Sequence, residues 1–170
     1  MRRFLFVFVA LLAVAFGLEL TPFAQAYVVT PWTDAVARVS GLLMRAFDGS
    51  ITTSDNVIAS RASPFAVSIE AGCNGLEATL VLIAAIVAFP ARWKHRLRGI
   101  VVGVLAVQAL NVVRVASLFY LGRWNRDVFE WAHLYVWQAL IMLDVLIVWV
   151  VWVRLIPARP LALAASPRMA

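Results

Sequence analysis

The stretch AGCNGLEATLVLIAAIVAF, residues 71–89, joins a polar segment to a long apolar run. The apolar run and its flanks predict a membrane span over about residues 74–90. Three further segments hold the roughly 20 mainly apolar residues that a bilayer core requires, at about residues 4–20, 99–121 and 134–153. The hydrophobic fraction of 64% is far above the roughly one half of soluble domains. The sequence therefore predicts an all-α polytopic membrane protein, a single integral domain over residues 1–170 built as a four-helix transmembrane bundle.

The basic residues indicate which way the chain crosses the membrane. They gather in three segments without Asp or Glu, at residues 2–3, 92–98 and 154–168. By the positive-inside rule these segments are cytoplasmic. Both termini are then inside, and residues 21–72 and 122–133 are outside. The formal net charge of +6 is thus a signal of topology, because the chain has no soluble basic domain of the kind that binds nucleic acid.

The first apolar segment allows a second interpretation. Its basic start, its apolar stretch and the sequence AQA at residues 24–26 imitate a signal peptide with a cleavage site. The apolar stretch over residues 4–18 is at the upper length limit for a signal peptide, which favours a retained helix. Cleavage would leave the outside position of the following segment unchanged.

Residues 21–72 form the largest segment outside the membrane, too small to bury a core of its own. From Pro31 to Phe47, apolar residues recur at three- and four-residue spacing and predict an amphipathic helix. Such a helix can lie on the outer membrane surface or pack against the bundle. Residues 51–70 predict one or two short strands. Strands beside a reactive side chain can hold a peptide by strand addition, or can simply cap the bundle.

Cys73 is the one cysteine in the chain and precedes the second predicted span. Free N–H groups and the positive dipole at the start of a helix favour thiolate over thiol, so Cys73 is a candidate nucleophile. Gly75 lets a substrate backbone approach closely, and Asn74 places an amide beside the thiol. Glu77, one helical turn further on, is expected on the same face as Cys73. The alternative is that Cys73 is a small buried hydrophobic residue, the usual role of a lone membrane cysteine.

Arg114 is expected inside the third span, roughly 10 Å of helix before its outer end. An arginine there costs several kcal/mol unless it is paired or faces an aqueous cavity, so a functional role is predicted. Asn111 lies one turn earlier and shares its surface. The alternative is that the Arg114 side chain snorkels to the outer interface.

Elimination makes His133 the candidate partner of the thiol. Of the two histidines, His95 lies in a basic cytoplasmic segment, whereas His133 begins the fourth span on the outside. An imidazole can activate a thiol and return its proton to a leaving amine. The alternative is an interfacial anchor among the neighbouring aromatic residues. One cysteine and one outer histidine do not make a zinc site, so neither a metal nor another cofactor is predicted.

With these motifs the chain resembles the exosortase/archaeosortase family of membrane-embedded cysteine transpeptidases. The resemblance rests on the sequence CNG at residues 73–75, on Asn111-x-x-Arg114 and on His133, and it covers about residues 65–155. Many family members have more spans, so the chain looks most like the short exosortase H branch. The resemblance implies that Cys73 is the nucleophile and that Arg114 and His133 complete the catalytic site. The expected supporting residues are Asn74, Gly75, Glu77 and Asn111.

The resemblance implies a protease or transpeptidase that cleaves C-terminal sorting signals through a thioester intermediate. Its substrates would be secreted proteins ending in a recognition motif, a transmembrane helix and a basic tail, and a second copy or a partner subunit would complete the cleft. The implied location is the bacterial cytoplasmic membrane, with the site facing the periplasm. Two alternatives stay open: an S-acyltransferase using the same cysteine, and a non-enzymatic assembly or transport subunit in which Gln108, Arg114 and Asp144 form a polar network.

Overall fold

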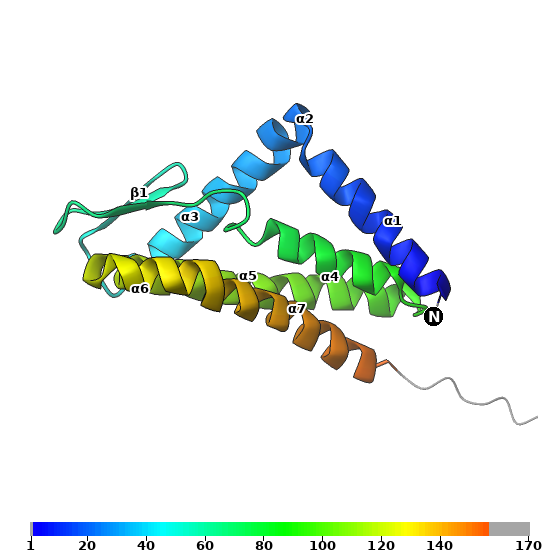
Figure 1. The fold of residues 1–170 in the computed structure, drawn as a ribbon. Coiled ribbons are helices and arrows are strands. Elements are labelled where there is room, and N and C mark those ends of the chain that lie inside the picture. The colour runs from blue at the N-terminus through cyan, green and yellow to red at the C-terminus, as the bar shows by residue number, and fades with distance from the viewer. Residues whose placement is uncertain (1, 157–170) are drawn as a thin grey trace, which may run out of the picture.

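The computed structural model describes residues 2–156, which are mostly helical. Figure 1 shows long helices with a small sheet at one end. The elements in chain order are α1 (Arg2–Glu19), α2 (Pro22–Ala24), the π-helical turn η1 (Gln25–Val29), α3 (Thr30–Arg45), β1 (Ile51–Ser54), β2 (Val57–Ser60), β3 (Ala66–Ser68), α4 (Leu76–Ala88), α5 (Trp93–Trp124), α6 (Arg126–Trp131), the π-helical turn η2 (Ala132–Val136) and α7 (Trp137–Arg154).

Two helices in the described part of the chain are long and apolar enough to cross a membrane. One is α5, and the other is the continuous helix over Arg126–Arg154 that α6, η2 and α7 form. The segments Arg2–Glu19 and Pro22–Arg45, bent by 71° at their junction, make a third if they count as one span. With 13 residues, α4 is roughly 20 Å long, shorter than a hydrocarbon core of about 30 Å. The four-helix transmembrane bundle therefore stays a prediction.

The half of the molecule that is predicted to lie in the membrane is built around α4, which packs against α1, α5 and α7. Leu82 and Ile86 of α4 and Val107 of α5 are fully buried in this core. Gly103 lets α5 approach closely, because a Cβ there would lie 2.7 Å from Leu82 Cδ2. Small residues at such contacts are typical of packed membrane helices.

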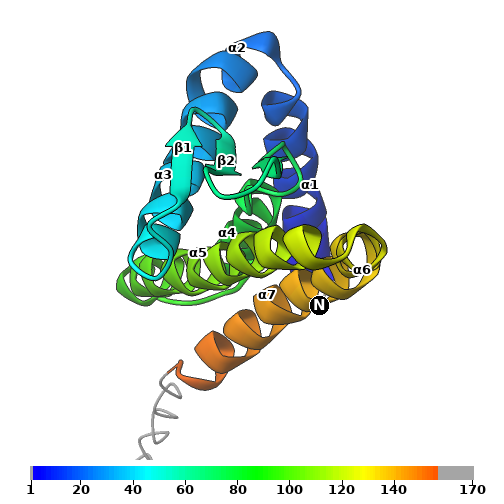
Figure 2. The same cartoon turned by 90° about the vertical axis from the view of Figure 1, so that its left-hand side faces the viewer.

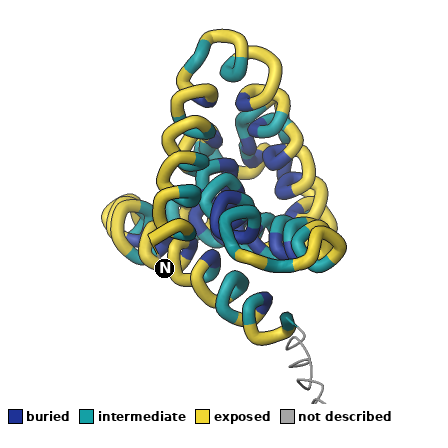
Figure 3. The backbone as a smooth tube through the Cα atoms, turned by 90° about the vertical axis from the view of Figure 1, so that its right-hand side faces the viewer, coloured by how far each residue is buried: buried dark blue, intermediate teal, exposed yellow. Residues whose placement is uncertain are grey.

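The first helix is part of this core. The ring of Phe4 lies 6.1 Å from that of Phe89 and 6.0 Å from that of Trp149, measured between centroids. This packing favours a retained helix over a cleaved signal peptide. Exposed residues follow the outer faces of the helices, as the yellow tube in Figure 3 shows. They include large apolar side chains such as Phe6, which is 76% exposed and suits contact with lipid.

The half of the molecule that is predicted to face outward, which we call the outer half, combines α3, the sheet and the last turns of α5. The strands form an antiparallel sheet in the order β1-β2-β3, one strand more than predicted. Val36 of α3, Ile58 of β2 and Phe119 of α5 share one apolar core. Figures 1 and 2 show α3 and the sheet on the same side of α5. The predicted amphipathic helix is thus present as α3, and one of its faces packs against the protein.

The second predicted outer segment, residues 122–133, is helical rather than a loop. Asn125 alone separates α5 from α6. Its Oδ1 accepts hydrogen bonds from the N–H groups of Asp127 (2.8 Å) and Val128 (3.1 Å), which caps the start of α6. Its charged residues form an exposed helix face, where Arg126 and Glu130 make an ion pair at 3.1 Å.

Candidate active site

Cys73, Arg114 and His133 meet at one pocket, although they come from three different elements. Cys73 lies in the loop between β3 and α4, Arg114 in α5 and His133 in η2. The Cys73 Sγ is 3.1 Å from Nε2 of His133 and 3.6 Å from an Nη2 donor of Arg114. All three side chains line a cavity of about 240 Å³. The arrangement combines a thiol, a base and a fixed cation at one point.

A π-helical turn sets the position of His133. The turn η2 interrupts the helix between α6 and α7, and such turns often occur at functional sites. The imidazole stacks on the ring of Phe129, with 5.6 Å between centroids, and its Nε2 is directed to the thiol. His95 lies at the far end of α5, where it stacks on Trp152. Among the described histidines, only His133 is therefore placed to exchange a proton with Cys73.

Arg114 is a buried cation with no carboxylate partner in the described part of the chain. Its residue is 2% exposed, which excludes snorkelling to the interface. One guanidinium nitrogen lies 3.5 Å from the carbonyl oxygen of Gly72, and another is the donor beside the thiol. A buried charge without a carboxylate partner is destabilising, which makes Arg114 a candidate for a role in chemistry rather than in folding.

Burial is the strongest influence on the pKa of the Cys73 thiol. Burial raises the pKa of Cys73 above its ordinary value, the nearby charge of Arg114 lowers it, and the carboxylates of Glu77 and Glu70 raise it further. The prediction that the helix start favours thiolate is wrong here, because Cys73 precedes the first residue of α4 by three positions and burial dominates. A thiol with a raised pKa needs a base to remove its proton before it can act as a nucleophile, and His133 Nε2 lies 3.1 Å away.

Asn74 was predicted to place its amide beside the thiol, but its side chain instead joins the Cys73 loop to α3 by a hydrogen bond. The side chain is fully buried. Its Nδ2 donates to Oγ1 of Thr33 (2.8 Å), and its Oδ1 accepts from the N–H of Leu76 (2.9 Å) at the start of α4. The backbone carbonyl of Asn74 accepts from Nε1 of Trp32 (3.1 Å). Sequence reasoning missed Trp32, because nothing local links two residues so far apart in the chain.

Other side chains complete the hydrogen bonding of this loop. Glu77 accepts from the N–H of Gly72 at 2.6 Å through Oε1. Gln108 donates through Nε2 to the carbonyl of Gly75 at 3.1 Å. Irregular backbone at membrane depth is tolerated only where protein groups satisfy it. Glu77 was predicted to share a helical face with Cys73, but Cys73 lies before the helix and Glu77 instead holds the loop through Gly72.

Asn111 lies beneath the loop on α5. It is fully buried, and neither of its amide atoms has a hydrogen-bond partner among the described residues. A Cβ on Gly75 would lie 3.0 Å from its Cγ, so the loop rests directly on this amide. Asn111 thus extends the polar surface of Arg114, and it is the predicted supporting residue whose bonding is least complete.

The polar network of the non-enzymatic alternative is not formed. No hydrogen bond joins Gln108, Arg114 and Asp144 to one another in the part of the chain that the structure describes: Gln108 bonds to the loop and to Thr79, and one Asp144 oxygen is buried without a partner. Residues 2–156 also hold no cluster of three or more His, Cys, Asp or Glu side chains that could bind a metal ion.

Gly75→Ala is expected to disrupt the site, whereas Gly72→Ala serves as its matched control. Both glycines have positive φ, +71° and +85°, which costs an alanine about 1–2 kcal/mol. A Cβ at Gly75 would also lie 2.8 Å from Nε2 of Gln108, but one at Gly72 meets nothing within 4 Å. In thermal unfolding of the protein in detergent, Gly75→Ala should lower the midpoint clearly more than Gly72→Ala. Equal shifts would contradict the packing of the loop on α5.

Comparison with known proteins identifies the family. Residues 1–151 match a family model described as transmembrane exosortase (Exosortase_EpsH). The match includes α1 and the outer segment, and so extends well beyond the residues on which the resemblance rested. No curated protein and no solved structure matches the chain. Because the family model covers most of the sequence, the chain belongs to the transmembrane exosortase family.

Proposed function

We propose that the protein is a membrane-embedded cysteine protease or transpeptidase that cleaves C-terminal sorting signals of secreted proteins. The observation that carries the proposal is the contact of the Cys73 Sγ with both His133 and Arg114 at the wall of one pocket. A thiol next to a base is the arrangement of a covalent cysteine catalyst. The proposed substrates end in a recognition motif, a transmembrane helix and a basic tail.

The reaction begins when His133 Nε2 takes the thiol proton and Sγ attacks the carbonyl carbon of the scissile peptide bond. The carbonyl oxygen becomes an oxyanion, and His133 then gives the proton to the leaving nitrogen as the C–N bond breaks. The substrate is left as a thioester on Cys73. Water or an incoming amine attacks the thioester, transfers a proton to His133 and releases the thiol.

Arg114 stabilises the oxyanion in this proposal. Its Nη2 is 3.6 Å from Sγ, so an oxygen on the carbon bonded to Sγ comes within reach of the guanidinium. One well-placed donor of this kind contributes roughly 3 kcal/mol to transition-state stabilisation. The same charge also lowers the pKa of Cys73, which eases the formation of the thiolate.

The topology that suits this function has both termini in the cytoplasm of a bacterial cell and the site facing the periplasm. In that arrangement α1, α4 with its flanks, α5 and the α6–α7 helix are the four crossings. Because α4 is only 13 residues long and Cys73 packs against the core of α3 and the sheet, the proposal puts Cys73 below the outer membrane surface. A substrate anchored by its own helix would present its scissile bond at this depth. A second copy or a partner subunit would complete the cleft.

Mass spectrometry of the trapped intermediate tests the proposal. Membranes that contain the protein and a secreted protein with a C-terminal motif, helix and basic tail are quenched with acid and digested. The peptide containing Cys73 should carry the substrate's new C-terminal residues, in a linkage that hydroxylamine cleaves. A fatty acyl adduct would instead identify an S-acyltransferase, and processing without any adduct on Cys73 would rule out the covalent route.

A further inference from the structure

One wall of the cavity at Cys73 is a continuous stretch of chain that leaves β3 and enters the turn closed by the bond from Cys73 N–H to the carbonyl of Glu70. Residues 67–71 line it, and they comprise the end of β3 and the segment that leads to Cys73. The other walls come from α5, α6 and η2, and include Phe129 and His133. The cavity therefore runs alongside β3 and reaches the thiol.

β3 is an edge strand of the sheet, since β2 is its only neighbour in the order β1-β2-β3. Ile69, just after β3, donates its N–H to the carbonyl of Asn56 at 2.9 Å. In the antiparallel register, the odd-numbered residues of this stretch consequently bond toward β2. Ala66 and Ser68 then direct their N–H and C=O groups to the free edge.

Pro64 and Glu70 flank β3, but the strand itself, Ala66–Ser68, contains neither proline nor a charged residue. Proteins usually block open edges with charged side chains, proline or a covering element. Ala66 and Ser68 are small and exposed, and they leave room for a further strand. An open edge beside a nucleophile is suited to main-chain recognition of a peptide.

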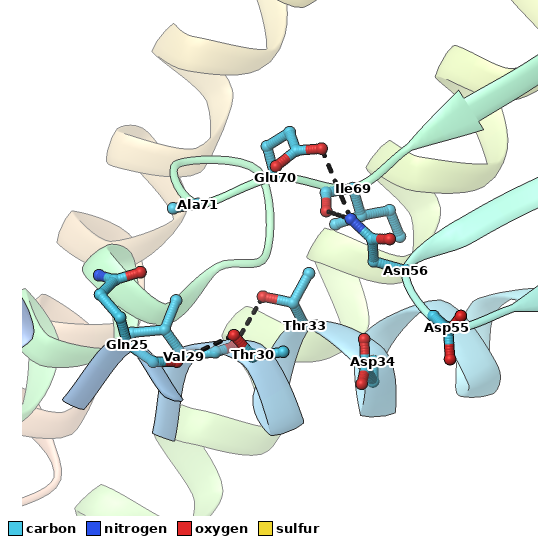
Figure 4. Close-up of a pocket in the computed structure, with 10 residues that line it drawn as sticks. All are labelled: Gln25, Val29, Thr30, Thr33, Asp34, Asp55, Asn56, Ile69, Glu70 and Ala71. Atoms are coloured by element: carbon cyan, nitrogen blue, oxygen red, sulfur yellow. Dashed lines mark hydrogen bonds between the residues drawn. The ribbon is translucent and has the colours of Figure 1, made fainter. Parts of the chain in front are cut away.

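The stretch is also held firmly from its other side. Asn56 Nδ2 donates to the carbonyl of Ile69 (2.9 Å) and contacts a carboxylate oxygen of Glu70 (3.5 Å), as Figure 4 shows. Ser68 Oγ donates to the same carboxylate at 2.5 Å. The edge is thus preformed, which reduces the ordering cost of binding.

We infer that the substrate segment preceding the scissile bond binds as an added β-strand on the free edge of β3. This inference rests on the proposed function. The substrate helix lies in the membrane, so the chain before it extends toward the outer half of the molecule, where β3 lies. The backbone groups of Ala66 and Ser68 bond alternate residues of the peptide, and its carbonyl carbon reaches the Cys73 Sγ.

Peptide chloromethyl ketones test the inference without a known substrate. Acetyl-tetraalanine chloromethyl ketone and chloroacetamide each alkylate a thiol with loss of chloride, and Cys73 is the one cysteine available. The rate of each reagent with Cys73 in detergent is divided by its rate with free cysteine. This ratio should be at least about tenfold larger for the peptide reagent than for chloroacetamide. Peptide reagents that are N-methylated at one residue should react about tenfold more slowly when the methyl group is at alternate positions, and at the normal rate when it is at the positions between them. The reason is that only alternate N–H groups of an added strand bond the edge.

Proline variants locate the binding edge. Ser68→Pro removes an N–H from the free edge of β3 and should abolish the faster reaction of the peptide reagent, while chloroacetamide still reacts. Thr53→Pro is the control on β1, the other edge strand. The bond from Arg61 N–H to the carbonyl of Ser50 shows that odd-numbered residues of β1 direct their N–H groups away from β2, so this variant also removes an N–H from a free edge. It should keep the faster reaction of the peptide reagent. Equal rates for the two reagents, or N-methyl effects without alternation, would overturn strand addition. Mass spectrometry of the Cys73 adduct formed with a protein substrate would still decide the proposed function separately.

Discussion

Replacing Cys73 with Ala is expected to stop processing of the sorting signal. The covalent route needs a nucleophile 3.1 Å from the base, and no other cysteine exists in the chain. Loss of a catalytic nucleophile lowers the rate by about 10⁴-fold or more. Cells that produce the variant and a substrate protein should therefore accumulate the uncleaved precursor, which is resolved from the product on a gel. Ser should behave like Ala, because its hydroxyl is a far weaker acid than a thiol.

The control for this experiment is Ser54→Ala, a change at an exposed position of β1 outside the pocket. The variant should process the precursor at the normal rate. Normal processing by Cys73→Ala, with the precursor and product correctly identified by mass, would show that another group performs the cleavage.

Arg114→Lys is the second change with a large expected effect. Lysine keeps the positive charge but lacks the planar fork that contacts both the Gly72 carbonyl and the thiol. If the oxyanion role is right, cleavage should slow by about 10²–10³-fold, the usual effect of losing one oxyanion donor. The pH dependence of Cys73 alkylation by iodoacetamide should change little, since the charge that lowers the thiol pKa remains.

The matched control is Arg123→Lys on the same helix. Arg123 makes a partly exposed ion pair with Asp48 at 3.1 Å, and such pairs contribute little. This variant should cleave normally. Near-normal cleavage by Arg114→Lys would show that the charge alone suffices, and would assign Arg114 to the thiol pKa instead of to the oxyanion.

The sequence predicted the residues of the pocket better than the shape around them. Cys73, Arg114 and His133 were each predicted near the outer side of a different span. That placement was enough to expect that the three side chains meet. Helix periodicity identified α3 and hydropathy identified α1. These signals are local, so a single sequence contains them.

Features that depend on contacts between distant segments of the chain could not be predicted from the sequence. The last turns of α5 look like membrane span because Val115 and Phe119 are apolar, yet they pack against α3 and the sheet. The bonds of Asn74 and Trp32 join segments that only the fold brings together. The direction of the Cys73 pKa depends on burial, which the spacing of residues does not reveal.

Labelling of Cys73 from outside the cell tests the central claim most directly. A sulfonated, membrane-impermeant methanethiosulfonate reagent is added to intact cells, and the single cysteine makes the labelled site unambiguous. If the thiol lies in a pocket open to the periplasm beside His133, it should be modified in intact cells, and His133→Asn should slow the modification at about neutral pH because the base is lost. Labelling only after the membrane is permeabilised, or none at all, would contradict an outward-facing catalytic pocket.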